Sequence, residues 1–157
     1  MDDIDEIRTR LTSGLLQATR QWRRAAEQAL ASHGISDACA APLLWIGRLG
    51  EGVRQVTLAS YVGIEGPSLV RLLDQLVASG LVERRDDPAD RRANTIWLTE
   101  EGKHLREEIE MQLVALRERV LAGISSEDLQ TTLRVLHAFD EGDPRSTGGR
   151  PAGDNEP

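Results

Sequence analysis

The sequence predicts a mainly α-helical chain with one small β-hairpin, an α+β fold. Three observations support this prediction. Long amphipathic segments occupy both ends of the chain, and short elements separated by glycines lie between them. The 157 residues, of which 39% are apolar and 29% charged, have the composition of a soluble globular domain with a core of its own.

Composition and termini exclude several classes of protein. The longest apolar run, Ala38–Ile46, is far shorter than the roughly 20 residues that a membrane span requires. The single cysteine, Cys39, excludes an intramolecular disulfide and a cysteine-rich zinc site. The acidic N-terminus does not resemble a secretory signal. We therefore expect a cytoplasmic protein with no membrane partner.

The first two segments predict helices. Ile4–His33 is one long helix, because its apolar residues recur at spacings of three, four and seven: Ile4, Ile7, Leu11, Leu15, Trp22, Ala26, Ala29 and Leu30. Gly34 is placed to end this helix in a left-handed conformation. Ser36 and Asp37 then cap a second helix that runs to Leu49.

Three short elements follow the second helix. Val53–Val56 predicts a strand, and Thr57 caps a brief helix over Leu58–Val62. A further helix covers Pro67–Ser79, with proline at the favoured first position, and Gly80 ends it. These two helices are joined by a tight turn that contains glycine.

The next residues predict a β-hairpin. Leu81–Arg84 and Asn94–Leu98 are expected to be its strands. Between them lies the loop Arg85–Ala93, in which Pro88 marks a turn.

Two more helices complete the ordered part. Thr99 caps a long one, whose apolar residues form a narrow seam suited to packing on another helix: Leu105, Ile109, Leu113, Leu116 and Val120. Ser125 and Asp128 start the last helix, whose apolar face consists of Leu129, Leu133, Leu136 and Phe139. Residues 142–157 have no apolar anchor, and we expect a disordered tail there.

This order of elements predicts a winged helix-turn-helix with long N- and C-terminal dimerisation helices. We place the winged core at about residues 53–98 and the dimerisation helices at about 4–33 and 100–141, all in a single domain of residues 1–141. The flanking helices carry more apolar positions than the small winged unit can cover. This excess predicts a homodimer whose interface is built from both chain ends.

The Pro67–Ser79 helix has a polar face suited to reading DNA. Pro67, Ser68, Arg71 and Gln75 share that face at steps of three and four. Arginine can donate two hydrogen bonds to guanine, glutamine can pair with adenine, and Ser68 at the helix start can hold a phosphate. The alternative interpretation, that Arg71 and Gln75 are simply a solvated face, stays open at this point.

The hairpin loop concentrates arginines, which suit the negative potential of a narrow minor groove: Arg84, Arg85, Arg91 and Arg92. The same stretch holds Glu83, Asp86, Asp87 and Asp90, so a self-neutralising ionic loop is the alternative. The net charge of the chain is −7, whereas DNA-binding domains are usually basic. Charge alone therefore does not establish DNA binding.

The stretch Gly63–Gly102 resembles the winged-helix core of the MarR family of bacterial transcription regulators, and within it the SlyA-like branch. The resemblance covers roughly Leu11 to Phe139 and is strongest from Gly63 onward. It rests on Pro67-Ser68-Leu69-Val70-Arg71, Leu73-Asp74-Gln75-Leu76, Gly80-Leu81-Val82, Asp90-Arg91-Arg92-Ala93, Leu98-Thr99-Glu100 and, before the last helix, Leu121-Ala122-Gly123-Ile124-Ser125-Ser126-Glu127.

The resemblance implies a symmetric dimer on double-stranded DNA with a pseudo-palindromic operator. It places five residues of the recognition helix at the major groove: Pro67, Ser68, Val70, Arg71 and Gln75. It makes Arg92 the minor-groove arginine, oriented by Asp90, with Arg84, Arg85 and Arg91 near the DNA backbone. The acidic pair Asp86-Asp87 and the near absence of lysine depart from the family pattern.

Other residues that carry chemistry have plainer interpretations. Cys39 lies among alanines in the second helix, which favours a small buried residue over the redox role that a cysteine has in some members of the family. The histidines His33, His104 and His137 match no metal-binding spacing. We expect no catalytic residues, no metal and no cofactor.

A ligand pocket is implied by the family resemblance, since relatives bind small aromatic or phenolic anions between the dimer helices and the winged domain. Aromatic walls and cations for such a ligand are available from Arg20, Trp22, Arg23, Leu44, Trp45 and Arg48. The alternative for the two tryptophans is core or dimer packing. The function predicted overall is a dimeric repressor released from DNA by a small aromatic ligand. The alternatives are a winged-helix adaptor for other proteins and a redox switch at Cys39.

Overall fold

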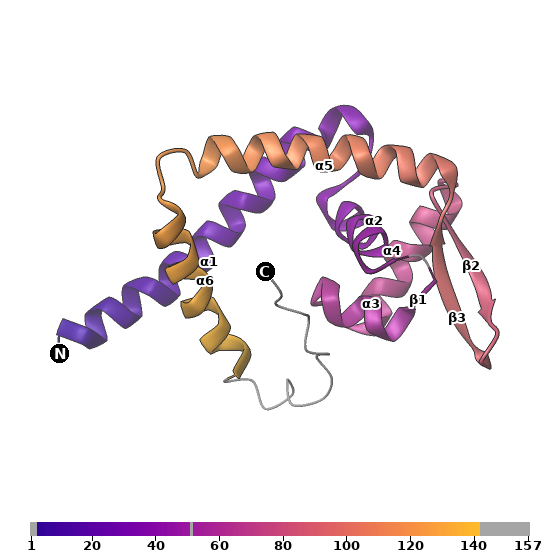
Figure 1. Cartoon of the computed structure of the whole chain (residues 1–157), viewed down its shortest axis with the longest axis horizontal. Coiled ribbons are helices and arrows are strands. Elements are labelled where there is room, and N and C mark those ends of the chain that lie inside the picture. The colour runs from indigo at the N-terminus through magenta and orange to yellow at the C-terminus, as the bar shows by residue number, and fades with distance from the viewer. Residues whose placement is uncertain (1–2, 51, 142–157) are drawn as a thin grey trace. The chain divides into compact units, whose positions relative to one another are not determined.

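The computed structural model describes residues 3–50 and 52–141, which fall into two compact units (Figure 1). The first unit ends at Arg119 and the second begins at Val120. The predicted tail, 142–157, lies outside the described residues. No helix in the described ranges has the length and hydropathy needed to cross a membrane. The elements in order are α1 (Asp3–Leu30), a 3₁₀ turn (Ala31–His33), α2 (Asp37–Leu49), β1 (Val53–Arg54), α3 (Gln55–Val62), α4 (Gly66–Ala78), β2 (Val82–Asp87), β3 (Asp90–Leu98), α5 (Glu100–Val120) and α6 (Ser126–Glu141).

The mainly helical fold with a small sheet is confirmed, and several helix ends follow the predicted caps. Gly34 has a left-handed φ of 67° at the end of the 3₁₀ turn. The Ser36 hydroxyl accepts a hydrogen bond from the backbone N–H of Cys39 at 3.2 Å and starts α2. Thr99 likewise accepts from the Gly102 N–H at 3.0 Å, and Ser125 accepts from the Asp128 N–H at 3.1 Å. Side-chain oxygens at these positions satisfy N–H groups that have no partner within the helix.

The helix-turn-helix starts earlier than the sequence predicts. The expected strand Val53–Val56 is only two residues long, and α3 begins at Gln55 rather than after Thr57. Arg54 is the extended residue that precedes the helix, and its side chain makes no cap. Val56 is 85% exposed on α3, so its apolar, β-branched side chain is the reason the sequence pattern was misleading here.

The hairpin is longer than predicted. The strands form an antiparallel sheet in the order β1-β3-β2, beside the helices of the winged unit (Figure 1). Most of the expected loop Arg85–Ala93 is strand, with a tight connection at Pro88 and Ala89. The apolar residues of β2 end at Val82, but its ladder with β3 continues through Arg85 opposite Thr95 and Asp86 opposite Asn94.

One hydrophobic core joins the helices to the sheet in the first unit. Its fully buried members come from α1 to α5: Leu30, Leu43, Ile46, Leu58, Leu69, Leu73, Ile96, Ile109 and Leu116. Three residues of the predicted seam on α5, at 109, 113 and 116, are therefore covered by their own protomer, whereas Val120 is 53% exposed. Most of the seam that was predicted to pack on another helix thus packs on the winged core of its own chain.

Apolar side chains remain exposed elsewhere on the helices. On α1 they are Ile4, Ile7, Leu11 and Leu16, with exposed fractions from 44% to 65%. On α6, which belongs to the second compact unit, Leu133 is 55% and Phe139 is 49% exposed. Exposed apolar faces of this kind are typical of interaction surfaces.

Gly102 is a point of close approach and carries a stability prediction. A Cβ at this position would overlap the backbone carbonyl oxygen of Leu81, so Gly102→Ala is expected to lower the free energy of unfolding by roughly 1–3 kcal/mol. Gly14→Ala is the matched control, because Gly14 also lies in a helix but has open space around it, and there the change should stabilise by about 0.5–1 kcal/mol. Urea unfolding of both variants measures this. Equal effects of the two substitutions would contradict the packing at Gly102.

Candidate nucleic-acid interface

The helix α4 divides into a buried and an exposed face, as the sequence predicts. Leu69, Leu73 and Leu76 are buried, whereas the predicted contact residues Pro67, Ser68, Val70 and Arg71 are exposed. Within the described part of the chain, the Arg71 guanidinium forms no ion pair or hydrogen bond. A cation therefore stands free on the outer face of this helix.

Gln75 is less free than its position on the helix suggests. It is exposed, but its Oε1 accepts a hydrogen bond from the thiol of Cys39 on α2 at 3.2 Å. Cys39 itself is only 6% exposed, as expected for a small buried residue. Pairing of Gln75 with a base therefore requires its amide to leave Cys39.

Two of the predicted wing arginines are engaged within the protein. Arg84 pairs with Asp74 of α4 at 2.7 Å, which ties β2 to the recognition helix. Arg85 pairs with Glu83, and its guanidinium carbon lies 4.2 Å from the centre of the Trp97 ring. Arg84 and Arg85 are therefore described better by the alternative interpretation, in which acidic residues of the protein neutralise the arginines, than as free cations.

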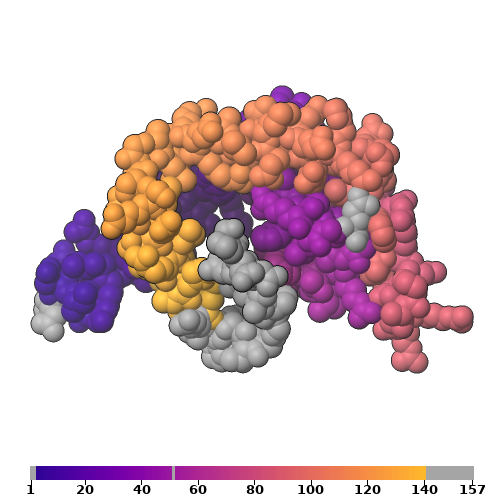
Figure 2. Space-filling view, viewed as in Figure 1, coloured from indigo at the N-terminus to yellow at the C-terminus, as the bar shows by residue number. Residues whose placement is uncertain are grey.

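The other two wing arginines lie on a bulge at the hairpin tip. In the ladder between β2 and β3, Asp86 lies opposite Asn94, whereas the next residue of β2, Asp87, lies opposite Asp90. Arg91 and Arg92 fall in the resulting gap and have no partner on β2. Both are exposed, and neither guanidinium forms an ion pair in the described ranges. The bulge directs both residues away from the regular ladder, as bulges do, and Figure 2 shows the hairpin tip projecting from its unit.

Two acidic residues hold the backbone of this tip. The Asp87 Oδ1 accepts from the Ala89 N–H at 2.8 Å, and the Asp90 Oδ1 accepts from the Arg92 N–H at 3.0 Å. The contact between Asp90 and Arg92 in the described ranges is therefore made to the backbone of Arg92 and not to its guanidinium. A short aspartate side chain reaches the amide two residues ahead more readily than the end of an arginine side chain, so Asp90 acts on the backbone.

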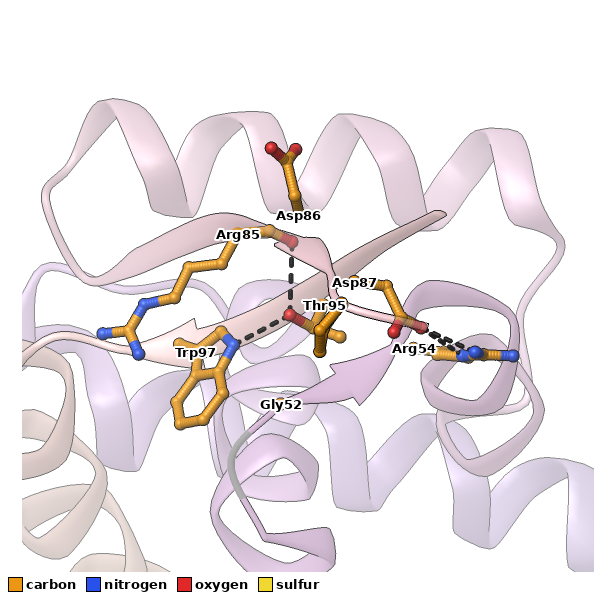
Figure 3. Close-up of a pocket in the computed structure, with 8 residues that line it drawn as sticks. Gly52, Arg54, Arg85, Asp86, Asp87, Thr95 and Trp97 are labelled. Carbon is orange, nitrogen blue, oxygen red and sulfur yellow. Dashed lines mark hydrogen bonds and ion pairs between the residues drawn. The ribbon is translucent and has the colours of Figure 1, made fainter. Parts of the chain in front are cut away.

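The outer face of the sheet forms a pocket of about 420 Å³ between β1 and the wing (Figure 3). Thr95 accepts a hydrogen bond from the Trp97 indole at 2.9 Å and donates one to the Arg85 carbonyl at 3.2 Å. At the other end of the pocket, Arg54 Nε donates to Asp87 Oδ2 at 2.7 Å, and Arg54 Nη2 lies 2.6 Å from the same oxygen. The hydrogen bond from the Ala89 N–H lowers the pKa of Asp87, burial raises it, and the Arg54 guanidinium lowers it. The net result is a lowered pKa.

A second, smaller cavity of about 150 Å³ contains most of the predicted ligand residues. Trp22, Leu44, Trp45 and Arg48 line it, whereas Arg20 and Arg23 do not. Arg48 lies over the Trp45 ring at 5.4 Å, and Trp45 also contacts Tyr61, with ring centres 5.1 Å apart. The two tryptophans thus take part in packing and line a cavity at the same time.

The cations of this cavity are already paired. Arg48 donates to both carboxylate oxygens of Glu110 at 3.0 Å, and Arg117 lies 3.2 Å from one of them. Burial raises the pKa of Glu110, but the hydrogen bonds and charges of the two arginines outweigh it, so the pKa is lowered. A carboxyl group with a lowered pKa stabilises the folded state above the ordinary pKa, and this stabilisation disappears as the pH falls and the group is protonated.

Glu110→Gln is accordingly expected to lower the free energy of unfolding at pH 7, by up to about 1 kcal/mol. The difference from the unmodified protein should shrink as the pH falls below the ordinary pKa of glutamate, and it should disappear once Glu110 is protonated. Urea unfolding at several pH values measures this, with Glu118→Gln, an exposed residue of the same helix, as the control. A difference that does not shrink as the pH is lowered would contradict the role given to the ion pairs.

Comparison with known proteins places this winged helix in a family. A model described as the MarR family matches residues 33–93. The crystal structure of the transcriptional regulator PA3341 is 36% identical, covers 83% of this chain and 98% of its own, and superposes with a TM-score of 0.74. The chain belongs to the MarR family.

Two further solved structures share the fold. A mutant of E. coli MarR complexed with operator DNA has a TM-score of 0.74 at 24% identity over 88% of this chain and 99% of its own. CouR from Rhodococcus jostii RHA1, bound to p-coumaroyl-CoA, is 27% identical over 96% of both chains, with a TM-score of 0.70.

In this MarR-family chain, sequence reasoning missed several residues that build the interface. Asp74, Arg54 and Trp97 hold the predicted arginines or the wing turn, and Glu110 pairs with Arg48. Arg54 lies next to the mispredicted strand, and its partner is 33 residues away. One sequence signal points to this outer face of the sheet. Thr95 and Trp97 are two residues apart on one strand, so they lie on the face opposite Ile96.

Proposed function

We propose that this protein is a dimeric, sequence-specific DNA-binding transcription regulator that acts as a repressor in the cytoplasm. The observation that carries the proposal concerns Arg71 on the outer face of α4 and Arg91 and Arg92 on the wing tip, whose guanidinium groups have no ion pair with any residue of the described ranges. Free, exposed arginines at these two places match the two grooves that a winged helix reads. A mutant of E. coli MarR, which shares the fold, forms a complex with operator DNA, and this supports a DNA-binding role.

In the proposed complex α4 enters the major groove of each half of a pseudo-palindromic operator, with Arg71 at a guanine. Pro67, Ser68 and Val70 lie at the same groove, and Gln75 reaches a base after leaving Cys39. Arg92 and Arg91 approach the minor groove from the bulge, which Asp90 holds through the backbone. Arg84 and Arg85 lie near the DNA backbone and fix the wing to α4 and to Trp97. Membership of the SlyA-like branch stays a prediction from the wing motif.

The proposal is tested by the salt dependence of binding. A duplex selected by the unmodified protein from a random-sequence library serves as the ligand. Arg92→Ala is expected to reduce the slope of log affinity against log salt by about one per subunit, because a groove or phosphate contact is lost. Arg24→Ala removes an exposed arginine of α1 and should leave the slope unchanged. Failure of the unmodified protein to select or retain any duplex would favour the adaptor function instead.

We also propose that a single-ring aromatic carboxylate binds in the 150 Å³ cavity and weakens DNA binding. Trp22 and Trp45 supply the walls, and Arg48 and Arg117 supply the cations, which Glu110 and the lining residue Asp37 offset in part. The ligand-bound state of CouR supports a ligand in this family. A cavity of this size suits one ring rather than a larger molecule.

Benzoate, followed by tryptophan fluorescence, tests the ligand proposal. Glu110→Gln should bind benzoate more tightly than the unmodified protein, because it leaves both guanidinium groups without their carboxylate. Arg48→Gln should bind benzoate more weakly. Equal affinity of all three proteins would show that the cavity does not bind this class of ligand.

A further inference from the structure

The carboxylate of Asp87 connects two parts of the winged unit that lie far apart in the sequence. It is nearly buried, at 6% exposure, although it follows the exposed Asp86 on the wing strand. Its Oδ1 accepts from the Ala89 N–H, which forms the turn of the wing. Its Oδ2 accepts from Arg54, which ends β1 (Figure 3). One side chain therefore holds the wing turn and the start of the helix-turn-helix together.

Arg54 lies where β1 meets the helix-turn-helix, so its contact with Asp87 affects how the wing is held. Arg54 is the extended residue at the N-terminus of α3, pairs with Thr95 of β3, and makes no helix cap with its side chain. Short helix α3 leads through Gly63 to α4. The Arg54–Asp87 ion pair thus joins the wing turn to the N-terminus of α3, the helix that leads into α4.

We propose that Arg54 and Asp87 are positioning residues, a wing tether that sets the direction of the Arg91–Arg92 bulge relative to α4. The inference rests on the proposed function and adds to it two residues that make no DNA contact themselves. The wing has few other restraints at its tip, because the bulge removes ladder partners from residues 91–93. A tether at the base of the turn reduces the entropy that the wing loses when it enters the minor groove.

The charge of Asp87 allows a sharp test against the simple electrostatic expectation. Asp87→Asn removes a negative charge close to DNA, so electrostatics alone predicts tighter binding. The tether predicts the opposite, a loss of affinity of about tenfold, because the asparagine still accepts from Ala89 but no longer pairs with the Arg54 cation. Asp86→Asn is the matched control. It removes the same charge one residue away, from a side chain that points away from Arg54 (Figure 3) and has no ion pair in the described ranges, and it should bind DNA as tightly as the unmodified protein or more tightly.

Arg54→Gln separates positioning from direct contact, since the Arg54 side chain is 52% exposed. The tether predicts that this variant loses about as much affinity as Asp87→Asn with an unchanged salt slope, and that the double variant is no weaker than either single one. A salt slope reduced by about one per subunit in Arg54→Gln, with Asp87→Asn binding as tightly as Asp86→Asn, would show a phosphate contact and overturn the tether.

Hydrogen exchange in the free protein gives a readout that does not depend on DNA. The amides of residues 88–92 should exchange faster in Arg54→Gln and Asp87→Asn than in Asp86→Asn, while the core of α4 stays protected. Unchanged exchange in both tether variants would overturn the inference. If the unmodified protein selects no duplex at all, the proposed function fails, and exchange at the wing still decides whether the tether exists.

Discussion

Replacing Ile7 of α1 by aspartate is expected to dissociate the dimer and to weaken operator binding by about 100-fold or more. Ile7 is 51% exposed in the single chain and lies in the apolar stripe of α1 with Ile4 and Leu11. A charge in a buried interface is costly to desolvate. In a dimer, binding of one subunit to its half-site holds the other subunit at a high effective concentration near the second half-site. Without the dimer, each subunit binds its half-site independently. Sedimentation velocity at micromolar concentration and titration of the selected duplex measure both effects.

Gln17→Asp is the control for this substitution, because Gln17 is an exposed polar residue of the same helix. It should remain dimeric, and its melting temperature, like that of the unmodified protein, should rise with protein concentration. An unmodified protein that sediments as a monomer at micromolar concentration would contradict the dimer.

Arg71→Ala carries the second large effect. We expect it to cost roughly 1–3 kcal/mol per half-site and to relax the preference for one base pair in each half. The physical reason is that the Arg71 guanidinium has no partner in the described part of the protein, so its hydrogen bonds are available to a base. Competition between the selected duplex and variants altered at single base pairs measures the loss of preference.

The matched comparison is Arg84→Ala, in which the removed guanidinium is already paired with Asp74. That variant should lose affinity about evenly across all competitor duplexes, because it loosens the wing and removes no base contact. Unchanged affinity and preference in a folded, dimeric Arg71→Ala protein would show that α4 does not read the operator through this residue.

The helices of this fold could be predicted from the sequence because local chemistry determines their ends. Ser36, Thr99 and Ser125 cap their helices through side-chain oxygens, and Gly34 supplies a left-handed residue. Each of these signals lies within a few residues of the structure that it controls. The buried face of α4 was predictable for the same reason, since Leu69, Leu73 and Leu76 repeat at helical spacing.

The hairpin and the state of its arginines depend on partners that are distant in the sequence. The extent of β2 and β3 is determined by a ladder that continues past the apolar residues, and the bulge appears only when the register of Asp86 and Asp87 is known. Local spacing suggested that Arg84, Arg85 and Arg92 are equivalent. Their partners distinguish them. Asp74 pairs with Arg84 and Trp97 lies against Arg85, whereas the Arg92 guanidinium has no ion pair in the described ranges.

The α5 seam shows the same limit for assembly. Its spacing suits packing on another helix, but spacing does not indicate whether that helix belongs to the same chain. In the structure Ile109, Leu113 and Leu116 are buried by their own protomer. The apolar side chains that stay exposed are instead on α1 and, in the second unit, on α6.

The most direct test of sequence-specific DNA binding is selection of duplexes from a random library by the unmodified protein, followed by titration of the enriched sequence at several salt concentrations. We expect a pseudo-palindrome whose half-sites lie about 10 base pairs apart, as a dimer with two recognition helices requires. The enriched duplex should bind at least about 1,000-fold more tightly than a scrambled one at physiological salt. Recovery of no common sequence, or equal affinity for the enriched and scrambled duplexes, would contradict the assignment of α4 and the wing as DNA-reading elements.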